Sequence, residues 1–178
     1  MIKPKILSVI LARGGSKAIP NKNIELLNKH PLLAYTIAEA RLSKYVSDIY
    51  VSSDSEIIRA IALQYGAKAI KRPIELSADD SKPVECILHA TRIAEKAISK
   101  KYDYVVELLC TNPFKTAKNI DEALEMQIQT NADSVIGVIR LDDHHPIRIK
   151  KIIDGVIHDF CIPEIPESRR QDLKPDAY

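Results

Sequence analysis

The stretch Ile6-Leu7-Ser8-Val9-Ile10-Leu11 decides the fold, because it is rich in β-branched residues and almost continuously apolar. A strand inside a parallel sheet is covered on both faces and has this composition, whereas a half-exposed strand alternates apolar and polar residues. A polar loop with two glycines, residues 12–23, follows directly. We therefore predict a buried strand of a parallel sheet, with this loop at its carboxyl end.

Helical and strand patterns alternate from this strand to residue 139. The predicted helices cover residues 32–43, 55–65, 83–98 and 116–129, and the further predicted strands cover residues 48–52, 67–70, 104–109 and 134–139. Apolar residues recur at helical spacing in the former, while the latter are short and apolar. This alternation predicts an α/β fold with a doubly wound, mostly parallel sheet in three layers.

Single residues mark several predicted boundaries. Gly66 follows the second helix and suits a left-handed helix stop, and Pro83 suits the first turn of the third helix. Asp54 precedes the second helix and is expected to cap it, while Thr116 or Asn119 is expected to cap the fourth. These residues support the predicted starts and ends.

The composition excludes several classes of protein. Of the 178 residues, 46% are hydrophobic and 28% are charged, which indicates one sizeable core. The formal net charge of +2 is too balanced for non-specific binding to nucleic acid. Cys86, Cys110 and Cys161 lie far apart, which predicts reduced thiols rather than a disulfide framework or a zinc site.

The chain shows no secretory signal and no apolar run of about 18 to 20 residues, the length that a membrane-spanning helix requires. We therefore expect a cytoplasmic protein that has no contact with a membrane.

Residues after 140 lack the alternating pattern. They contain short strand-like pieces around Asp154 and Gly155 and a proline-rich tail over residues 162–178. This segment offers no core of its own, so we expect it to pack on something else. We predict a main domain at residues 1–140 and an arm at residues 141–178.

Ligands of doubly wound sheets bind beyond the carboxyl ends of the strands, which directs attention to loops 12–23, 71–82 and 110–116. The first loop matches neither of the common glycine-rich phosphate-binding patterns. Its glycines nevertheless allow close approach of the backbone, and Arg13, Lys17 and Lys22 could neutralise a polyanion such as a triphosphate. The alternative is a solvated turn with incidental charges.

A series of motifs in this chain resembles those of the acylneuraminate cytidylyltransferases, the CMP-sialic acid synthetase family. The motifs are Leu11-Ala12-Arg13-Gly14-Gly15-Ser16-Lys17, Ile19-Pro20, Lys22-Asn23, Val51-Ser52-Ser53-Asp54, Lys71-Arg72-Pro73, Glu75-Leu76, Asp79-Asp80-Ser81, Tyr102-Asp103-Tyr104-Val105, Thr111-Asn112-Pro113-Phe114-Lys115-Thr116, Ala132-Asp133-Ser134-Val135, His144-His145-Pro146 and Arg169-Arg170-Gln171-Asp172-Leu173. They follow the family's order and cover essentially the whole chain.

The resemblance implies a Rossmann-like nucleotidyltransferase fold and transfer of a cytidylyl group. The anomeric hydroxyl of a 2-keto-3-deoxy sugar acid, such as a nonulosonic acid, would attack the α-phosphate of CTP and release pyrophosphate. Mg²⁺ would support this step. The main domain would bind the nucleotide, and the arm would complete the sugar-acid site in a homodimer.

The resemblance also assigns residues. The nucleotide-binding set would be Ala12, Arg13, Gly14, Gly15, Ser16, Lys17, Asn23, Arg72, Asp80 and Ser81, with Lys22 and Arg13 as the catalytic cations. The sugar-acid-binding set would be Thr111, Asn112, Lys115, Arg148 and Arg170, of which the last two would act in part across the dimer interface.

Two features depart from the family pattern. Leu109 stands where the best-studied members have a glutamine that contacts the sugar, and Lys115 replaces an arginine, which leaves the acceptor open. The chain also ends at Tyr178, before the family's Asp-x-Asp magnesium pair, so no metal ligands are identified. We expect a truncated member of the family. A non-catalytic CTP-binding fragment or regulatory domain, and a nucleotidyltransferase for another acceptor, stay open as alternatives.

Overall fold

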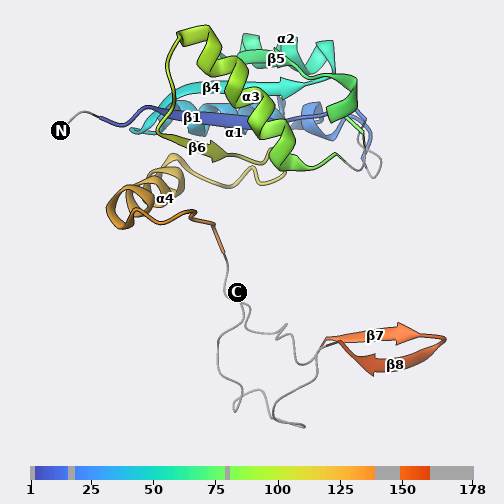
Figure 1. Cartoon of the computed structure of the whole chain (residues 1–178). Helices are drawn as coiled ribbons and strands as arrows, with labels where there is room; N and C mark the ends of the chain where they lie inside the picture. Colours follow the sequence, from blue (N-terminus) through green and yellow to red (C-terminus); the bar gives the residue numbers. More distant parts are fainter. Residues whose placement is uncertain (1–2, 16–18, 79–80, 139–148, 161–178) are drawn as a thin grey trace. The chain divides into compact units, whose positions relative to one another are not determined.

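The strand at Ile6–Leu11, β1, lies inside a four-stranded parallel sheet of the computed structural model (Figure 1). The other strands are β4 (Val46–Ser53), β5 (Lys68–Lys71) and β6 (Tyr104–Glu107), and the order is β5-β4-β1-β6. All three strand pairs are parallel. Val9 lies opposite Tyr50 on one side and Glu107 on the other, so β1 is paired along both edges, as the sequence predicts.

The structure describes residues 3–15, 19–78, 81–138 and 149–160. It divides the chain into two compact units, Met1–Asp133 and Ser134–Tyr178. This division precedes the predicted boundary at residue 140. The functions predicted for the main domain and the arm stay predictions.

Helices cover both faces of the sheet in the first unit. The helices α1 (Leu32–Leu42), α2 (Glu56–Gln64) and α4 (Ala117–Thr130) pack on one face, where Ile6, Ile10 and Val51 join Leu33, Ile58 and Leu124 in one apolar cluster. On the other face, Leu7 and Val9 pack against Ala90 and Ala94 of α3 (Pro83–Ile98), which lies in front of the sheet in Figure 1. This three-layer α/β architecture confirms the predicted fold class.

Short elements fill two of the connections. After β1 come the 3₁₀ turn η1 (Lys22–Ile24) and the two-residue strands β2 (Leu26–Leu27) and β3 (His30–Pro31), which pair with each other. A second 3₁₀ turn, η2 (Ile74–Leu76), follows β5. None of these short elements was predicted, because two or three residues carry no readable periodicity.

The boundary residues behave as expected with one exception. Gly66 has a φ of 87° just after α2, Pro83 is the first residue of α3, and Thr116 caps α4 in a reciprocal capping box with Asn119. The prediction for Asp54 was wrong, because Ser55 caps α2 by accepting a hydrogen bond from the Ile58 amide. The Asp54 side chain has a different partner, described below.

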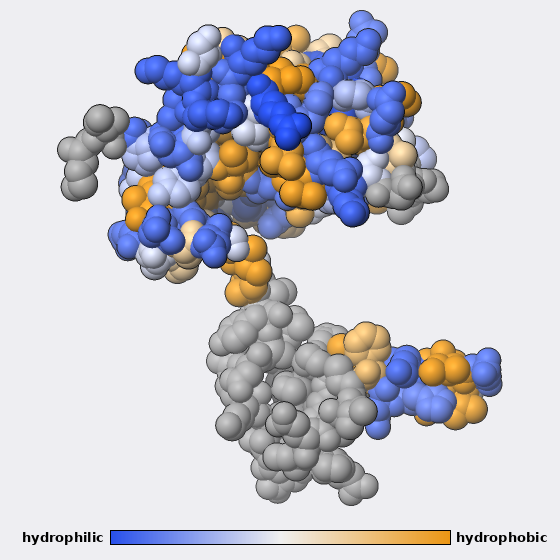
Figure 2. Space-filling view, viewed as in Figure 1, coloured by the Kyte–Doolittle hydropathy of each residue, from blue (hydrophilic) through white to orange (hydrophobic). Residues whose placement is uncertain are grey.

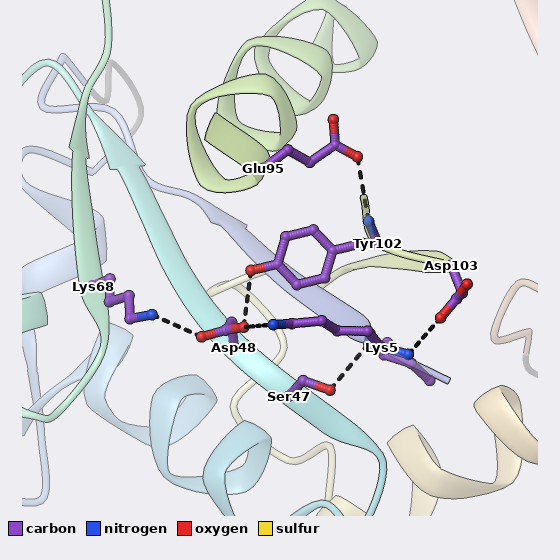
Figure 3. A network of polar contacts seen from close by, with 8 residues as sticks. Lys5, Ser47, Asp48, Lys68, Glu95, Tyr102 and Asp103 are labelled. Carbon is purple, nitrogen blue, oxygen red and sulfur yellow. Dashed lines mark hydrogen bonds and ion pairs between the residues drawn. The ribbon is translucent and has the colours of Figure 1, made fainter. Parts of the chain in front are cut away.

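A polar network joins the strands near the amino end of the sheet (Figure 3). The Asp48 carboxylate accepts hydrogen bonds from Lys68 Nζ at 2.7 Å and from the Tyr102 hydroxyl at 2.9 Å, and Lys5 Nζ lies 3.8 Å away. Burial alone would raise the pKa of Asp48, but the hydrogen bonds and positive charges outweigh it and lower that pKa below its ordinary value. Burial and the contact with Asp48 raise the pKa of Tyr102.

Among its described residues, the second unit has an antiparallel hairpin of β7 (Lys150–Ile153) and β8 (Val156–Asp159), with Asp154 and Gly155 at positive φ in its turn. The hairpin presents exposed apolar residues, which are orange in Figure 2. These residues are Ile149, Ile152, Ile153, Val156, Ile157 and Phe160.

The predicted strand at residues 134–139 is wrong over the part that the structure describes. Residues 134–138 form no strand, and Ile136 and Val138 are exposed. Alternating apolar residues favour a strand only where a neighbouring strand supplies backbone hydrogen bonds, and no ladder pairs this segment in the described part of the chain.

Candidate active site

A cleft of about 610 Å³ lies where the strands of the first unit end. Such a volume falls within the range of about 300–1,000 Å³ that small-molecule sites occupy. The residues that line it are Leu11, Arg13, Lys22, Asn23, Arg72, Leu76, Ala78, Ser81, Pro83, Cys86, Glu107, Leu109, Cys110 and Thr111. They come from the three loops that the sequence singled out, together with the ends of β1 and β6 and the first turns of α3.

The loop after β1 is held to its neighbour strand by backbone contacts. The Ala12 amide donates to the Ser52 carbonyl at 3.1 Å, and the Gly14 amide donates to Asp54 Oδ1 at 2.9 Å. A Cβ on Gly14 would lie 3.0 Å from the Ser55 Cβ, which leaves little space for any other residue. Asp54 therefore shapes this loop instead of capping α2.

Asn23 closes the same loop from its far side. Its side chain is buried and its Nδ2 donates to the Arg13 carbonyl at 3.0 Å. The contact links η1 back to the residue that follows Ala12, so Arg13 and Lys22 line one cleft although nine positions separate them. Asn23 thus positions the two predicted catalytic cations.

Three cations, Arg13, Lys22 and Arg72, line the cleft and differ in how far the protein itself engages their charged groups. Arg13 Nη1 reaches the Ala78 carbonyl at 3.4 Å, at the long end of hydrogen-bond distance. Within the described part of the chain, no hydrogen bond or ion pair engages the Lys22 ammonium. Lys22 is therefore the cation whose charge is most available to a ligand.

Arg72 is buried and is held by Ser52. Its Nε donates to Ser52 Oγ at 3.1 Å and its Nη2 donates to the Ser52 carbonyl at 2.6 Å. Burial lowers the pKa of the guanidinium, which nevertheless stays charged near neutral pH. A buried cation beside a cleft favours an anionic or carbonyl ligand that restores the solvation it has lost.

The segment after β6 forms the remaining wall, with Leu109, Cys110 and Thr111. Burial raises the pKa of the Cys110 thiol to about 11, so it is protonated near neutral pH. Cys86, from α3, is also buried and donates to the Leu76 carbonyl at 3.2 Å. The Cys110 thiol therefore contributes shape to the cleft and no charge, and Cys86 is held by its contact with Leu76.

Lys115 is engaged within the protein. Its ammonium donates to Thr36 Oγ1 at 2.8 Å, to the Leu109 carbonyl at 2.7 Å and to the Asn112 carbonyl at 2.5 Å. Burial lowers its pKa. An ammonium has three N–H donors, so these contacts use all of them. In this structure Lys115 ties the turn that carries Leu109 to α1, and its role as a ligand of the sugar acid stays a prediction.

The structure brings most of the predicted residues together. Arg13, Lys22, Asn23, Arg72, Ser81 and Thr111 line the cleft, Ala12, Gly14 and Gly15 form the loop after β1, and Asn112 and Lys115 lie in the turn after β6. Ser16, Lys17, Asp80, Arg148 and Arg170 lie outside the described residues.

The sequence analysis missed Glu107 and Cys86 as residues of the cleft. Glu107 carried a readable signal, because it is a charged residue at the carboxyl end of an otherwise apolar strand. Cys86 carried none, since a cysteine on a helix is equally well explained as part of the core.

The predicted magnesium was tested against the side chains present. Among the described residues, no group of three or more His, Cys, Asp or Glu side chains could hold a metal ion. The Asp54 carboxylate is occupied by the Gly14 amide, and Asp79 and Asp80 lie outside the described residues. The side chains described do not form a metal site. Over the same residues, no helix is long and apolar enough to cross a membrane.

Comparison with known proteins finds cytidylyltransferases that are similar to this chain. Residues 7–152 match the family model described as Cytidylyltransferase. N-acylneuraminate cytidylyltransferase A of Danio rerio is 36% identical over 84% of this chain and 33% of its own length. The N-acylneuraminate cytidylyltransferase of Escherichia coli O18:K1:H7 is 36% identical over 86% of this chain and 35% of its own length. Post-translational flagellin modification protein B of Campylobacter coli is 31% identical over 86% and 66%. The chain thus spans between a third and two thirds of these relatives.

Solved structures agree on the fold. CMP:2-keto-3-deoxy-manno-octonic acid synthetase complexed with CTP has a TM-score of 0.58 at 20% identity, over 72% of this chain and 49% of its own. 4-Diphosphocytidyl-2C-methyl-D-erythritol synthase has a TM-score of 0.61 at 12% identity, over 88% and 68%. At these identities the likeness concerns the fold alone. The family model covers most of the chain and the curated relatives agree with it, so the chain belongs to the cytidylyltransferase family.

Proposed function

We propose that this chain binds CTP in the cleft and transfers its cytidylyl group to a 2-keto-3-deoxy sugar acid, with release of pyrophosphate. One observation carries the proposal: Arg13, Lys22 and Arg72 line a single cleft at the carboxyl ends of a parallel sheet. Names of relatives support the nucleotide and the class of acceptor, since they include N-acylneuraminate cytidylyltransferases and a CMP-sugar-acid synthetase complexed with CTP.

The phosphates are assigned to the loop after β1. Phosphoryl transfer asks a protein mainly for in-line positioning and neutralisation of charge. Lys22 offers an ammonium without a partner in the described residues, and Arg13 offers a guanidinium in the same cleft. Of the two, Lys22 is the residue whose positive charge we propose the transfer depends on most.

The base is assigned to the wall that contains Arg72, Ala78 and Ser81. Cytosine differs from uracil by an exocyclic amine and by the protonation of one ring nitrogen. Hydrogen bonds from backbone groups of loop 77–82 would suffice to distinguish the two, because the wrong base would leave a polar group unpaired, which is costly. Arg72, fixed by Ser52, would supply the neighbouring positive charge.

The reaction is a displacement at the α-phosphorus. The anomeric hydroxyl oxygen of the sugar acid forms the new bond to phosphorus, and the bond to the bridging oxygen of the leaving group breaks. Pyrophosphate carries away the electron pair of that bond, and the hydroxyl proton leaves to solvent. Lys22 and Arg13 stabilise the charge that develops on the phosphate oxygens.

Three further features belong to the proposal. The family implies magnesium, and we expect activity to depend on it, although no step above uses it.

A homodimer is supported by the β7–β8 hairpin, because an isolated two-stranded hairpin is marginally stable and this one exposes Ile152 and Ile157. Arg148 and Arg170 would then reach the acceptor, and a cytoplasmic location would supply the CTP.

The test is release of pyrophosphate. The chain is incubated with CTP, magnesium and either N-acetylneuraminic acid or 2-keto-3-deoxy-manno-octonic acid, and CTP is then replaced by UTP, GTP or ATP. We expect release with CTP and one of the acids. Binding of CTP without release would support the alternative of a non-catalytic CTP-binding domain. Release with another nucleotide would assign a different nucleotidyl transfer.

A further inference from the structure

Glu107 occupies an unusual place in the cleft. It is the last residue of β6, and it lines the cleft together with Leu109, two positions further along. Because side chains alternate along a strand, both lie on the face of the sheet that α3 covers elsewhere. The helix packs mainly on β1 and β4, so this part of the face stays open and Glu107 is exposed.

The carboxylate of Glu107 has no partner in residues 3–15, 19–78, 81–138 and 149–160, where no hydrogen bond or ion pair engages it. Two other carboxylates of the first unit are used by the protein itself. Asp48 binds Lys68 and Tyr102, and Asp54 binds the Gly14 amide. Glu107 therefore has its hydrogen-bonding capacity directed to whatever enters the cleft.

Charge is unevenly distributed along the cleft. Arg13 and Lys22 belong to the loop after β1, and Arg72 follows β5 at one edge of the sheet. Glu107 lies on β6, at the opposite edge from β5. Among the described residues it is the one acidic side chain that lines the cleft. An ionised carboxylate accepts hydrogen bonds and repels anions, so it suits neither the triphosphate nor the carboxylate of a sugar acid.

We propose that Glu107 determines acceptor specificity: its carboxylate accepts hydrogen bonds from hydroxyl or amide N–H groups of the acceptor sugar and turns the sugar's own carboxylate away from β6. This inference rests on the proposed cytidylyl transfer. The apolar Leu109 beside it offers no hydrogen bond, so Glu107 supplies the polar recognition on this wall.

The experiment compares Glu107→Gln with wild type in pyrophosphate release. The glutamine keeps the size and one acceptor oxygen but removes the charge. We expect kcat/KM for the acceptor to fall by about 10- to 100-fold, the range for loss of a hydrogen bond to a charged group. The KM for CTP should stay within about twofold, as a residue outside the nucleotide half predicts. Glu122→Gln, an exposed change on α4, is the matched control and should alter neither value.

Binding keeps the inference testable if the chain releases no pyrophosphate. Calorimetry then measures binding of N-acetylneuraminic acid and of 2-keto-3-deoxy-manno-octonic acid to the chain saturated with CDP. Acceptor affinity that falls only in Glu107→Gln supports this inference while the proposed transfer fails. The inference is overturned if the variant matches wild type toward the acceptor, if CTP binding changes instead, or if neither acid binds.

Discussion

The two ends of the central sheet use charge in opposite ways. At the amino end, Asp48 is surrounded by Lys5, Lys68 and Tyr102, so its charge is satisfied within the protein. At the carboxyl end, Lys22 and Glu107 have no side-chain partners in the part of the chain that the structure describes. The comparison teaches that one end stabilises the fold and the other is left available for a ligand.

The two ends should therefore respond differently to substitution. Removing a charge that is paired within the protein leaves its partners without a hydrogen bond and lowers the free energy of unfolding. Removing an unpaired charge leaves the fold unchanged and weakens the binding of a ligand. Measuring both the free energy of unfolding and nucleotide binding or turnover separates the two responses.

The largest effect is expected for Lys22→Ala. We expect the rate of pyrophosphate release to fall by about 100-fold or more, because one charge on the transferring phosphates is lost. Thermal unfolding should stay as in wild type. Lys100→Ala, which removes an exposed cation near the opposite end of the sheet, should change neither quantity. Equal losses in the two variants would show that Lys22 has no particular role.

A smaller effect, on stability alone, is expected for Asp48→Asn. Loss of the charged hydrogen bonds to Lys68 and Tyr102 should lower the free energy of unfolding by about 1.5–3 kcal/mol in a denaturant titration. Affinity for CTP should be unchanged in a parallel calorimetric titration. A variant that unfolds like wild type but binds CTP poorly would reverse the roles assigned to the two ends.

The same residue predicts a dependence of stability on pH. The pKa of Asp48 is lowered in the folded protein relative to its ordinary value of 3.8. Its contribution is therefore present above that ordinary value and is lost as the pH falls through the folded pKa. The difference in unfolding free energy between wild type and Asp48→Asn should shrink as the pH falls below about 4. A difference that stays constant down to pH values well below this point would contradict the assignment.

Lys115 sharpens the comparison, because it is a cation near the carboxyl end whose donors are all used. Lys115→Met should lower the free energy of unfolding by about 1–2 kcal/mol, since the turn after β6 loses its link to Thr36. If Lys115 instead binds the sugar acid directly, the variant should unfold like wild type and raise the KM of the acceptor. Denaturation and steady-state kinetics on one preparation separate the two roles.

Local patterns predicted most of the fold. The apolar run at Ile6–Leu11, the glycine at position 66 and the threonine at position 116 act within a few residues, so the sequence alone reveals them. The predicted strand at residues 134–139 failed because a strand also needs a neighbour, which a local pattern does not contain.

The site was predictable where charged residues come directly after a strand in the sequence. Arg13 and Lys22 belong to the loop after β1, and Arg72 follows β5, so their meeting was expected from the topology. Contacts over long separations were not predictable. Asp54 meets Gly14 across 40 positions, and Lys115 meets Thr36 across 79, and only the fold brings them together.

The most direct measurement is a titration of the ¹⁵N-labelled chain with CTP, followed by amide chemical shifts. The account predicts that shifts change at residues 12–15, 22–23, 72 and 74–78, and stay constant at Lys5, Asp48, Lys68 and Tyr102. Changes centred on Asp48, or on the basic surface of Arg92, Lys96, Lys100 and Lys101 along α3 and the loop after it, would contradict it. A titration that leaves all amides unchanged would do the same.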